Sequence, residues 1–150
     1  MQVDVAIAGA SFAGLGVAHY LRDAGFDVLL IDRKDVGEGR TSTCGVPKRL
    51  VDEVAPGTIL RTVKNFYIET QRLRRKFEIP EEYGVIDYKK SCVSLFEKSA
   101  AGFMKAEVLG TADGKINTSE GGVEAKFIID CTGWRRVLSG NKGAGKLLIV

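Results

Sequence analysis

Two glycines and one acid near the start of the chain have the spacing of a nucleotide-binding turn. Gly9 and Gly14 enclose Ala10–Ala13, and Asp32 follows Gly14 by 18 residues. Gly9 permits a sharp turn, and Gly14 permits close packing of a following helix. The first N–H groups of that helix would face a pyrophosphate, while the Asp32 carboxylate would accept hydrogen bonds from ribose hydroxyls and repel the extra phosphate of NADP. This pattern indicates a site for the ADP half of a dinucleotide.

One position departs from the usual pattern of this turn. Ser11 stands where the middle glycine normally lets the backbone approach the phosphates. Serine is small and can donate its own hydroxyl, so we expect the site to be kept in altered form.

The elements that must position these residues are visible in the hydrophobic pattern. An apolar strand, Val3–Ala8, leads into the turn, and a second apolar strand, 26–31, ends at Asp32. Between them, Ala18 and Leu21 share one helical face, and Gly25 is the expected C-terminal stop. Strand, glycine turn, helix, strand and acid predict an α/β, Rossmann-like domain with a central parallel sheet. The alternative is a tight turn of the same fold that binds nothing.

A second motif follows a near-continuous apolar run, Phe127–Ile129, which is typical of a strand covered on both faces. The strand leads into Asp130-Cys131-Thr132-Gly133-Trp134. Thr132 and Gly133 would bring bare backbone to the carboxyl edge of a parallel sheet, where open α/β folds bind ligands. A loop without a ligand role is the alternative.

Periodicity predicts further elements along the chain. These are a loop over 40–47, a helix over 48–54, a strand or hairpin arm over 58–70, an amphipathic helix over 88–100 with Cys92, Leu95, Phe96 and Ser99 at helical spacing, and strands over 103–111 and 122–131.

The basic run 72–76 is interpreted as a solvated face or turn, with a phosphate or membrane-surface contact as the alternative. His19 lies beside the packing face of the first helix, so we expect surface exposure and no catalytic role. The glycine-rich stretch 140–146 has P-loop spacing, but Leu147 replaces the magnesium-binding Ser or Thr, which indicates a chance match.

Composition bounds the class of protein. The chain has 150 residues with a formal net charge of +3, which suits one domain and does not call for nucleic acid. No apolar run approaches the roughly 20 residues of a membrane span. Cys44, Cys92 and Cys131 are odd in number and widely spaced, so neither a disulfide framework nor a metal site is indicated. We expect a cytoplasmic protein, with Cys92 and Cys131 as packing residues.

The order of these motifs resembles the geranylgeranyl reductases, FAD-dependent oxidoreductases that hydrogenate isoprenoid chains. The resemblance rests on the turn Phe12-Ala13-Gly14, on Asp32, on Cys44-Gly45 and on Thr132-Gly133-Trp134. It covers essentially the whole chain, but only the N-terminal part of a family member. Where many relatives have an arginine before the helix at 88, this chain has Lys89 and Lys90 nearby.

The resemblance implies an FAD-binding domain with a small additional β element, NAD(P)H or a ferredoxin-type protein as electron donor, and an isoprenoid or other hydrophobic substrate. Cys44 would lie near the flavin ring as a candidate catalytic thiol. Such a role requires a partly exposed, electropositive setting, which nearby Arg40 would help to provide; a buried thiol is the alternative. Val108 would present backbone to the adenine. The implied cofactor contacts are Gly9, Ser11, Phe12, Ala13, Gly14, Asp32, Arg33, Cys44, Gly45, Val108, Thr132 and Gly133.

The resemblance also implies what residues 1–150 do not contain. Family members continue into a flavin-contacting Gly-Asp element and an antiparallel substrate domain, and nothing in this sequence matches either. We therefore expect the N-terminal FAD-binding part of a reductase, with the substrate domain absent. The alternatives are a non-catalytic fragment that binds FAD or NAD, and a flavin monooxygenase or halogenase domain, since the fold alone does not separate these chemistries.

Overall fold

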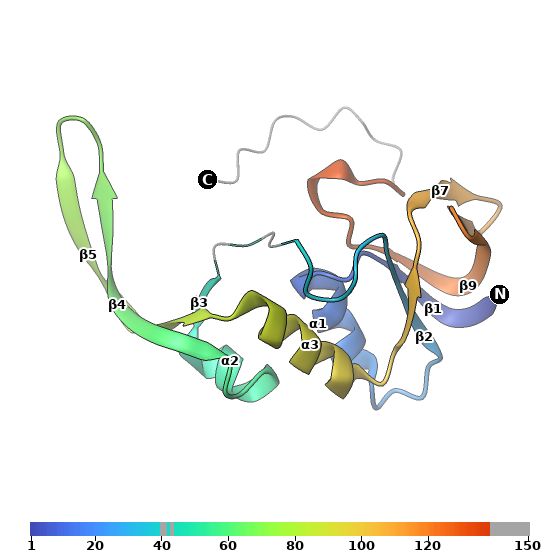
Figure 1. Cartoon of the computed structure of the whole chain (residues 1–150), viewed down its shortest axis with the longest axis horizontal. Helices are drawn as coiled ribbons and strands as arrows, with labels where there is room; N and C mark the ends of the chain where they lie inside the picture. The colour runs from blue at the N-terminus through green and yellow to red at the C-terminus, as the bar shows by residue number, and fades with distance from the viewer. Residues whose placement is uncertain (40–41, 43, 139–150) are drawn as a thin grey trace.

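The computed structural model describes residues 1–39, 42 and 44–138 and is built around a six-stranded sheet (Figure 1). Four neighbouring strands are parallel, in the order β6-β2-β1-β9, and β8 and β7 continue the sheet in antiparallel fashion. The strands are β1 (Gln2–Ala8), β2 (Val28–Asp32), β6 (Gly102–Lys105), β7 (Val108–Ala112), β8 (Lys115–Thr118) and β9 (Gly121–Asp130). This is a Rossmann-like α/β arrangement, as the sequence predicts.

The strand register brings the predicted motifs to one edge of the sheet. Ala8, the last residue of β1, pairs with Ile31 of β2 on one side and with Asp130 of β9 on the other. The glycine turn, Asp32 and the loop after Asp130 therefore leave the sheet at the same level.

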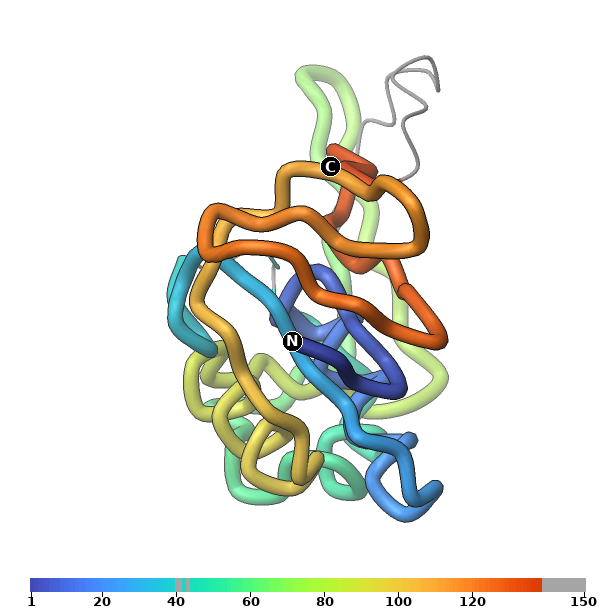
Figure 2. Tube along the Cα trace, turned by 90° about the vertical axis from the view of Figure 1, so that its right-hand side faces the viewer, coloured from blue at the N-terminus to red at the C-terminus, as the bar shows by residue number. Residues whose placement is uncertain are grey.

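Both faces of the sheet are covered at the central strands β1 and β2. Ile7 and Leu30 face the helical layer of α1 (Phe12–Leu21), α2 (Lys48–Val54) and α3 (Tyr88–Ser99). Ala6 and Ile31, one residue away in each strand, pack on the opposite face with Ile116 of β8 and with β9. Figure 2 shows β7–β9 in orange on one side of blue β1, with α2 and α3 on the other. Fully buried apolar positions on both faces explain the continuous apolar runs of β1 and β2. The expectation of a strand covered on both faces is wrong for Phe127–Ile129 in β9, because Phe127 is 57% exposed and Ile128 and Ile129 are only partly buried.

A second, antiparallel sheet has the order β3-β5-β4 and corresponds to the expected small β element. It consists of β3 (Gly45–Pro47), β4 (Ile59–Glu69) and β5 (Arg74–Ile86). The outer half of the β4–β5 hairpin extends away from the central sheet (Figure 1) and leaves Phe66, Tyr67 and Ile68 exposed. The basic run begins in the hairpin turn and continues into β5, with every member solvent-exposed, which fits the interpretation as a solvated face or turn.

Several predicted elements are confirmed with small shifts of their ends. The helix over 48–54 is α2, the helix over 88–100 is α3, and the strand over 58–70 is β4. The Asp87 carboxylate begins α3 by accepting a hydrogen bond from the Lys90 N–H at 3.1 Å, which is a typical N-cap. Cys92 is fully buried in α3, as expected of a packing residue.

Other expectations are wrong or incomplete. The strand predicted over 103–111 is two strands, because β6 pairs with β2 while β7 turns away to pair with β8; the buried Ala106 between them donates its N–H to the Asp32 carbonyl at 2.9 Å. The strands β3, β5 and β8 were not predicted. The first helix ends at Leu21, before Gly25, which lies in the following turn. Arg40, the P-loop-like stretch 140–146 and Leu147 lie outside the described residues.

The expected surface position of His19 is also wrong. His19 is 7% exposed, because α2 and α3 cover the face of α1 on which it lies.

Candidate functional site

A cavity of about 500 Å³ lies where the parallel strands end and α1 begins. We call it the strand-end cavity. It is formed by the turn after β1, the residues after β2, the start of β7 and the loop after β9. Its lining includes Gly9, Ala10, Ser11, Ala13, Asp32, Arg33, Lys34, Tyr88, Glu107, Val108, Cys131, Thr132, Gly133, Trp134 and Arg135. Its volume lies within the usual range of about 300–1,000 Å³ for ligand sites.

Two glycines allow neighbouring backbone segments to approach each other closely beside this cavity. Gly9 has φ +105°, and a Cβ there would collide with the Cys131 carbonyl oxygen. A Cβ on Gly14 would collide with the Gly9 carbonyl oxygen. Gly14 is buried and therefore acts through close helix packing, while Gly9 itself lines the cavity.

The Asp32 carboxylate ties the glycine turn to the end of β2. Its Oδ2 accepts the Ala10 N–H at 2.9 Å, and its Oδ1 accepts the Lys34 N–H at 3.0 Å. A carboxylate offers about four lone-pair positions, so capacity for further donors such as ribose hydroxyls remains. Asp32 thus has a structural role in addition to the predicted ligand role.

The start of α1 is set by Ser11, its N-cap residue. The Ser11 hydroxyl lies 3.2 Å from the Tyr88 hydroxyl, so α3 helps to orient it. Ser11 and Ala13 line the cavity, while Phe12 turns away and packs edge-on against Tyr88 with ring centroids 5.0 Å apart. The first-turn N–H groups of α1, which a helix cannot pair internally, thus belong to the cavity wall.

Asp130 organises the loop after β9. Its Oδ1 accepts hydrogen bonds from the Thr132 N–H at 3.0 Å and from the Thr132 hydroxyl at 2.6 Å, and its Oδ2 accepts the Leu138 N–H at 3.1 Å. The Thr132 hydroxyl in turn accepts the Val137 N–H at 3.0 Å. Gly133, at φ +74°, then presents backbone to the cavity. The Thr132 side chain shapes this loop, and the contact surface is the Gly133 backbone.

Charged side chains of both signs surround the opening. Arg33, Lys34 and Arg135 supply positive charge suited to phosphates. Among the acids, Asp35 is paired with the Lys105 ammonium at 2.6 Å. Burial, and then the neighbouring Asp130, raises the pKa of the Cys131 thiol, so that side chain is a neutral part of the wall.

Most of the predicted contacts come together here, but four do not. Gly9, Ser11, Ala13, Asp32, Arg33, Val108, Thr132 and Gly133 line the strand-end cavity, whereas Phe12, Gly14, Cys44 and Gly45 do not. Lys89 and Lys90 are exposed and also lie outside its lining.

Cys44 is buried, at 1% exposure. Its N–H is donated to the Ser42 hydroxyl at 3.1 Å and its thiol to the Ser42 carbonyl at 3.3 Å. The partly exposed setting that a reactive thiol requires is absent in this arrangement, which favours the alternative of a buried thiol.

Asp130, Trp134 and Arg135 contribute to the site although no role was predicted for them from the sequence. The spacing Asp-x-Thr at a strand end, typical of a side chain that closes its own turn, was the available signal for Asp130. Trp134 is 81% exposed, with the Arg135 guanidinium 5.8 Å from its ring centroid.

The comparisons with known proteins agree with this geometry. Residues 7–73 match the family of NAD(P)-binding Rossmann-like domains. No curated protein sequence matches the chain significantly.

Many solved structures share the fold at low sequence identity. A geranylgeranyl bacteriochlorophyll reductase-like protein from Thermoplasma acidophilum has a TM-score of 0.66 at 22% identity, over 86% of this chain and 38% of its own. A flavin-dependent brominase has a TM-score of 0.71 at 14% identity, over 90% of this chain and 39% of its own. The myxobacterial chondrochloren halogenase, a variant of the FAD-dependent halogenases, has a TM-score of 0.67 at 16% identity, over 86% and 37%.

These likenesses establish the Rossmann-like fold. The chain spans about two fifths of the length of each of these three structures. Within the part of the chain that the structure describes, no helix has the length and apolar character needed to cross a bilayer.

Proposed function

We propose that this chain is the FAD-binding part of a flavin-dependent oxidoreductase and that the strand-end cavity holds the ADP half of FAD. The observation that carries the proposal is the convergence of the glycine turn, Asp32 and the Gly133 loop on one cavity of about 500 Å³. Flavin-dependent enzymes among the proteins of the same fold support FAD over other dinucleotides.

The cavity residues fit the group. The Ser11–Ala13 end of α1 would hold the pyrophosphate through backbone N–H groups, with the positive end of the helix dipole behind them. Asp32 would hold the ribose, and Val108 would face the adenine with its backbone. A Cβ on Gly133 would meet nothing within 4 Å, so the loop there leaves room for a ligand against the backbone. When bound, FAD would supply hydride transfer, and the protein would position it and exclude water.

We propose the geranylgeranyl reductase type for the whole enzyme, with an isoprenoid or other hydrophobic alkene as substrate and NAD(P)H as donor. The order of Asp32, Cys44-Gly45 and Thr132-Gly133-Trp134 supports it, together with the fold shared with the Thermoplasma acidophilum protein. The brominase and the chondrochloren halogenase support a second candidate, a flavin halogenase or monooxygenase. In a longer form of the protein, loss of a substrate double bond would favour the first, and halide incorporation the second.

We also propose a cytoplasmic location. All three cysteines are free thiols, with two of them buried, which suits a reducing compartment.

Flavin retention tests the cofactor assignment. We expect the purified chain, after addition of FAD and desalting, to keep flavin absorbance between about 350 and 500 nm, and excess ADP to displace it. Asp32→Asn should weaken retention by about tenfold to a hundredfold, because a hydrogen bond to a charged group is worth about 1.5–3 kcal/mol. Asp113→Asn, in an exposed turn outside the cavity, is the matched control. Equal loss in both variants, or displacement by NAD as effective as by FAD, would contradict the proposal.

A further inference from the structure

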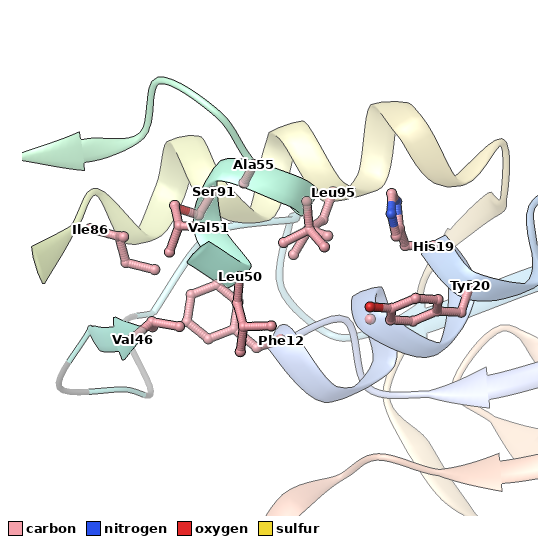
Figure 3. A pocket seen from close by; sticks show the side chains of 12 residues that line it. Phe12, His19, Tyr20, Val46, Leu50, Val51, Ala55, Ile86, Ser91 and Leu95 are labelled. Carbon is pink, nitrogen blue, oxygen red and sulfur yellow. The ribbon is translucent and has the colours of Figure 1, made fainter. Parts of the chain in front are cut away.

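A second cavity, of about 260 Å³, lies on the other side of α1, between α1, α2 and α3 (Figure 3). We call it the interhelix cavity. The Phe12 ring, which lines it, and the Tyr88 ring, which lines the strand-end cavity, together form the wall between the two. Its lining is Phe12, Gly16, His19, Tyr20, Val46, Leu50, Val51, Val54, Ala55, Ile86, Ser91 and Leu95.

This lining is almost wholly apolar, but two buried polar side chains interrupt it. Figure 3 shows His19 on α1 and Ser91 on α3 at opposite ends of the cavity, with Leu95 between them. His19 is 7% exposed and Ser91 is 1% exposed. A buried polar group without a partner loses the hydrogen bonds it would make in water, so each such group requires an explanation.

The hydrogen bonds of His19 fix where its proton lies. The Arg22 guanidinium lies 3.0 Å from His19 Nε2 and also donates to the His19 carbonyl at 2.9 Å. Because arginine has donors only, Nε2 must accept, and the neutral ring carries its proton on Nδ1. Burial, followed by the charges of Arg22 and Lys98, lowers the pKa of His19, which keeps the ring neutral at pH 7. The Nδ1–H donor has no partner among the described residues.

Ser91, on the facing helix α3, also has a buried polar atom, its Oγ, without a hydrogen-bond partner among the described residues. The cavity therefore combines an apolar body with a donor at one end and a hydroxyl at the other.

We propose that the interhelix cavity binds a small, neutral, mainly apolar molecule whose oxygen accepts a hydrogen bond from His19 Nδ1–H. At about 260 Å³ it is larger than the roughly 150 Å³ apolar cavity that admits benzene. A charged ligand is disfavoured because the lining offers no countercharge, and the nearby cations are already engaged: Arg22 with Asp23 at 3.1 Å and Lys98 with the Val54 carbonyl at 3.1 Å. This site is separate from the proposed FAD site.

The chain provides a direct reporter for this proposal, because His19 is its only histidine. We would titrate the 150-residue chain with methyl hexyl ketone, which has an acceptor and no donor, and follow the Nδ1 and Nδ1–H resonances by ¹H–¹⁵N NMR. The expected result is a saturable downfield shift of the Nδ1–H proton. Neither n-octane, which has no acceptor, nor n-octylammonium, which is charged, should produce it.

Gly16 provides a variant that fills the cavity without disturbing the fold. It lines the cavity, and a Cβ there would meet nothing within 4 Å. Gly16→Leu should therefore abolish the ketone-dependent shift while α1 gains helix propensity. Gly122→Leu, at an open position of β9 outside the cavity, should leave the shift unchanged.

Three results would overturn the proposal: no saturable shift with the ketone, the same shift with n-octane, or an unaltered shift in Gly16→Leu. The outcome is independent of the proposed cofactor, because FAD binding is read separately, by retained flavin absorbance.

Discussion

The strand-end cavity and the interhelix cavity share α1 as a wall but are built from different parts of the chain. The strand-end cavity is shaped by backbone: Gly9 and Gly14 lie against neighbouring carbonyl groups, and the carboxylates of Asp32 and Asp130 accept hydrogen bonds from backbone N–H groups. The interhelix cavity is lined by side chains from three helices and the strands beside them.

The glycines of α1 show this difference within a single turn of helix. Gly14 has no room for a Cβ, whereas Gly16 faces open space in the interhelix cavity. Packing around α1 is thus close at Gly14, whereas looser packing at Gly16 leaves a volume that a ligand can fill.

The largest expected effect comes from adding a side chain at Gly14, where the backbone of Gly9 leaves no room for one. Gly14→Val should destabilise the protein by at least 3 kcal/mol, because overpacking usually costs about 1–3 kcal/mol and the obstacle here is the backbone carbonyl of Gly9. Thermal unfolding should show a fall in Tm of roughly 10 °C. Gly16→Ala, two residues away, should instead raise stability by up to about 1 kcal/mol. Similar losses in both variants would contradict the contrast between the two sides of α1.

The next effect concerns the loop that completes the strand-end cavity. Asp130→Ala should remove the acceptor for Thr132 and Leu138 and destabilise the protein by about 1.5–3 kcal/mol, the range for hydrogen bonds to a charged group. Urea unfolding measures this change. Because Asp130 does not line the interhelix cavity, the NMR shift of His19 should keep its ketone response; loss of that response would show that the two regions are not independent.

A smaller effect is expected from pH. Since the pKa of His19 is lowered in the folded protein, the unfolded chain binds more protons as pH falls through about 6.5, so the free energy of unfolding should rise with pH between about 5 and 7. His19→Gln should flatten this rise in urea unfolding at several pH values. If the free energy of unfolding rises equally with pH in the variant, groups other than His19 cause the rise.

The smallest effect concerns the thiols. Cys44 and Cys92 are buried, and burial chiefly raises the pKa of Cys92 to about 11, so a thiol reagent should label them only after unfolding. Cys131 is partly exposed and should be the one cysteine labelled slowly in the native protein, which mass spectrometry can identify. Rapid labelling of Cys44 would restore the hypothesis of a reactive thiol at that position.

The two cavities also differ in how well the sequence predicted them. Gly9, Gly14 and Asp32 are required by one local backbone path, so their spacing alone indicated the site and the parallel strands around it. The interhelix cavity depends on the approach of α2 and α3 to α1, which no local pattern specifies; for that reason His19 was expected at the surface. The split between β6 and β7 was missed for the same reason, since the choice of partner strand is a tertiary property.

The central claim, that the strand-end cavity holds FAD, is tested most directly through Trp134. It is the only tryptophan of the chain and it lines this cavity. We predict that FAD quenches its fluorescence saturably in the folded chain and that Asp32→Asn shifts the midpoint at least tenfold, whereas Asp113→Asn does not. Fluorescence that is unchanged by FAD in a folded protein, or quenched equally in both variants, would contradict the account.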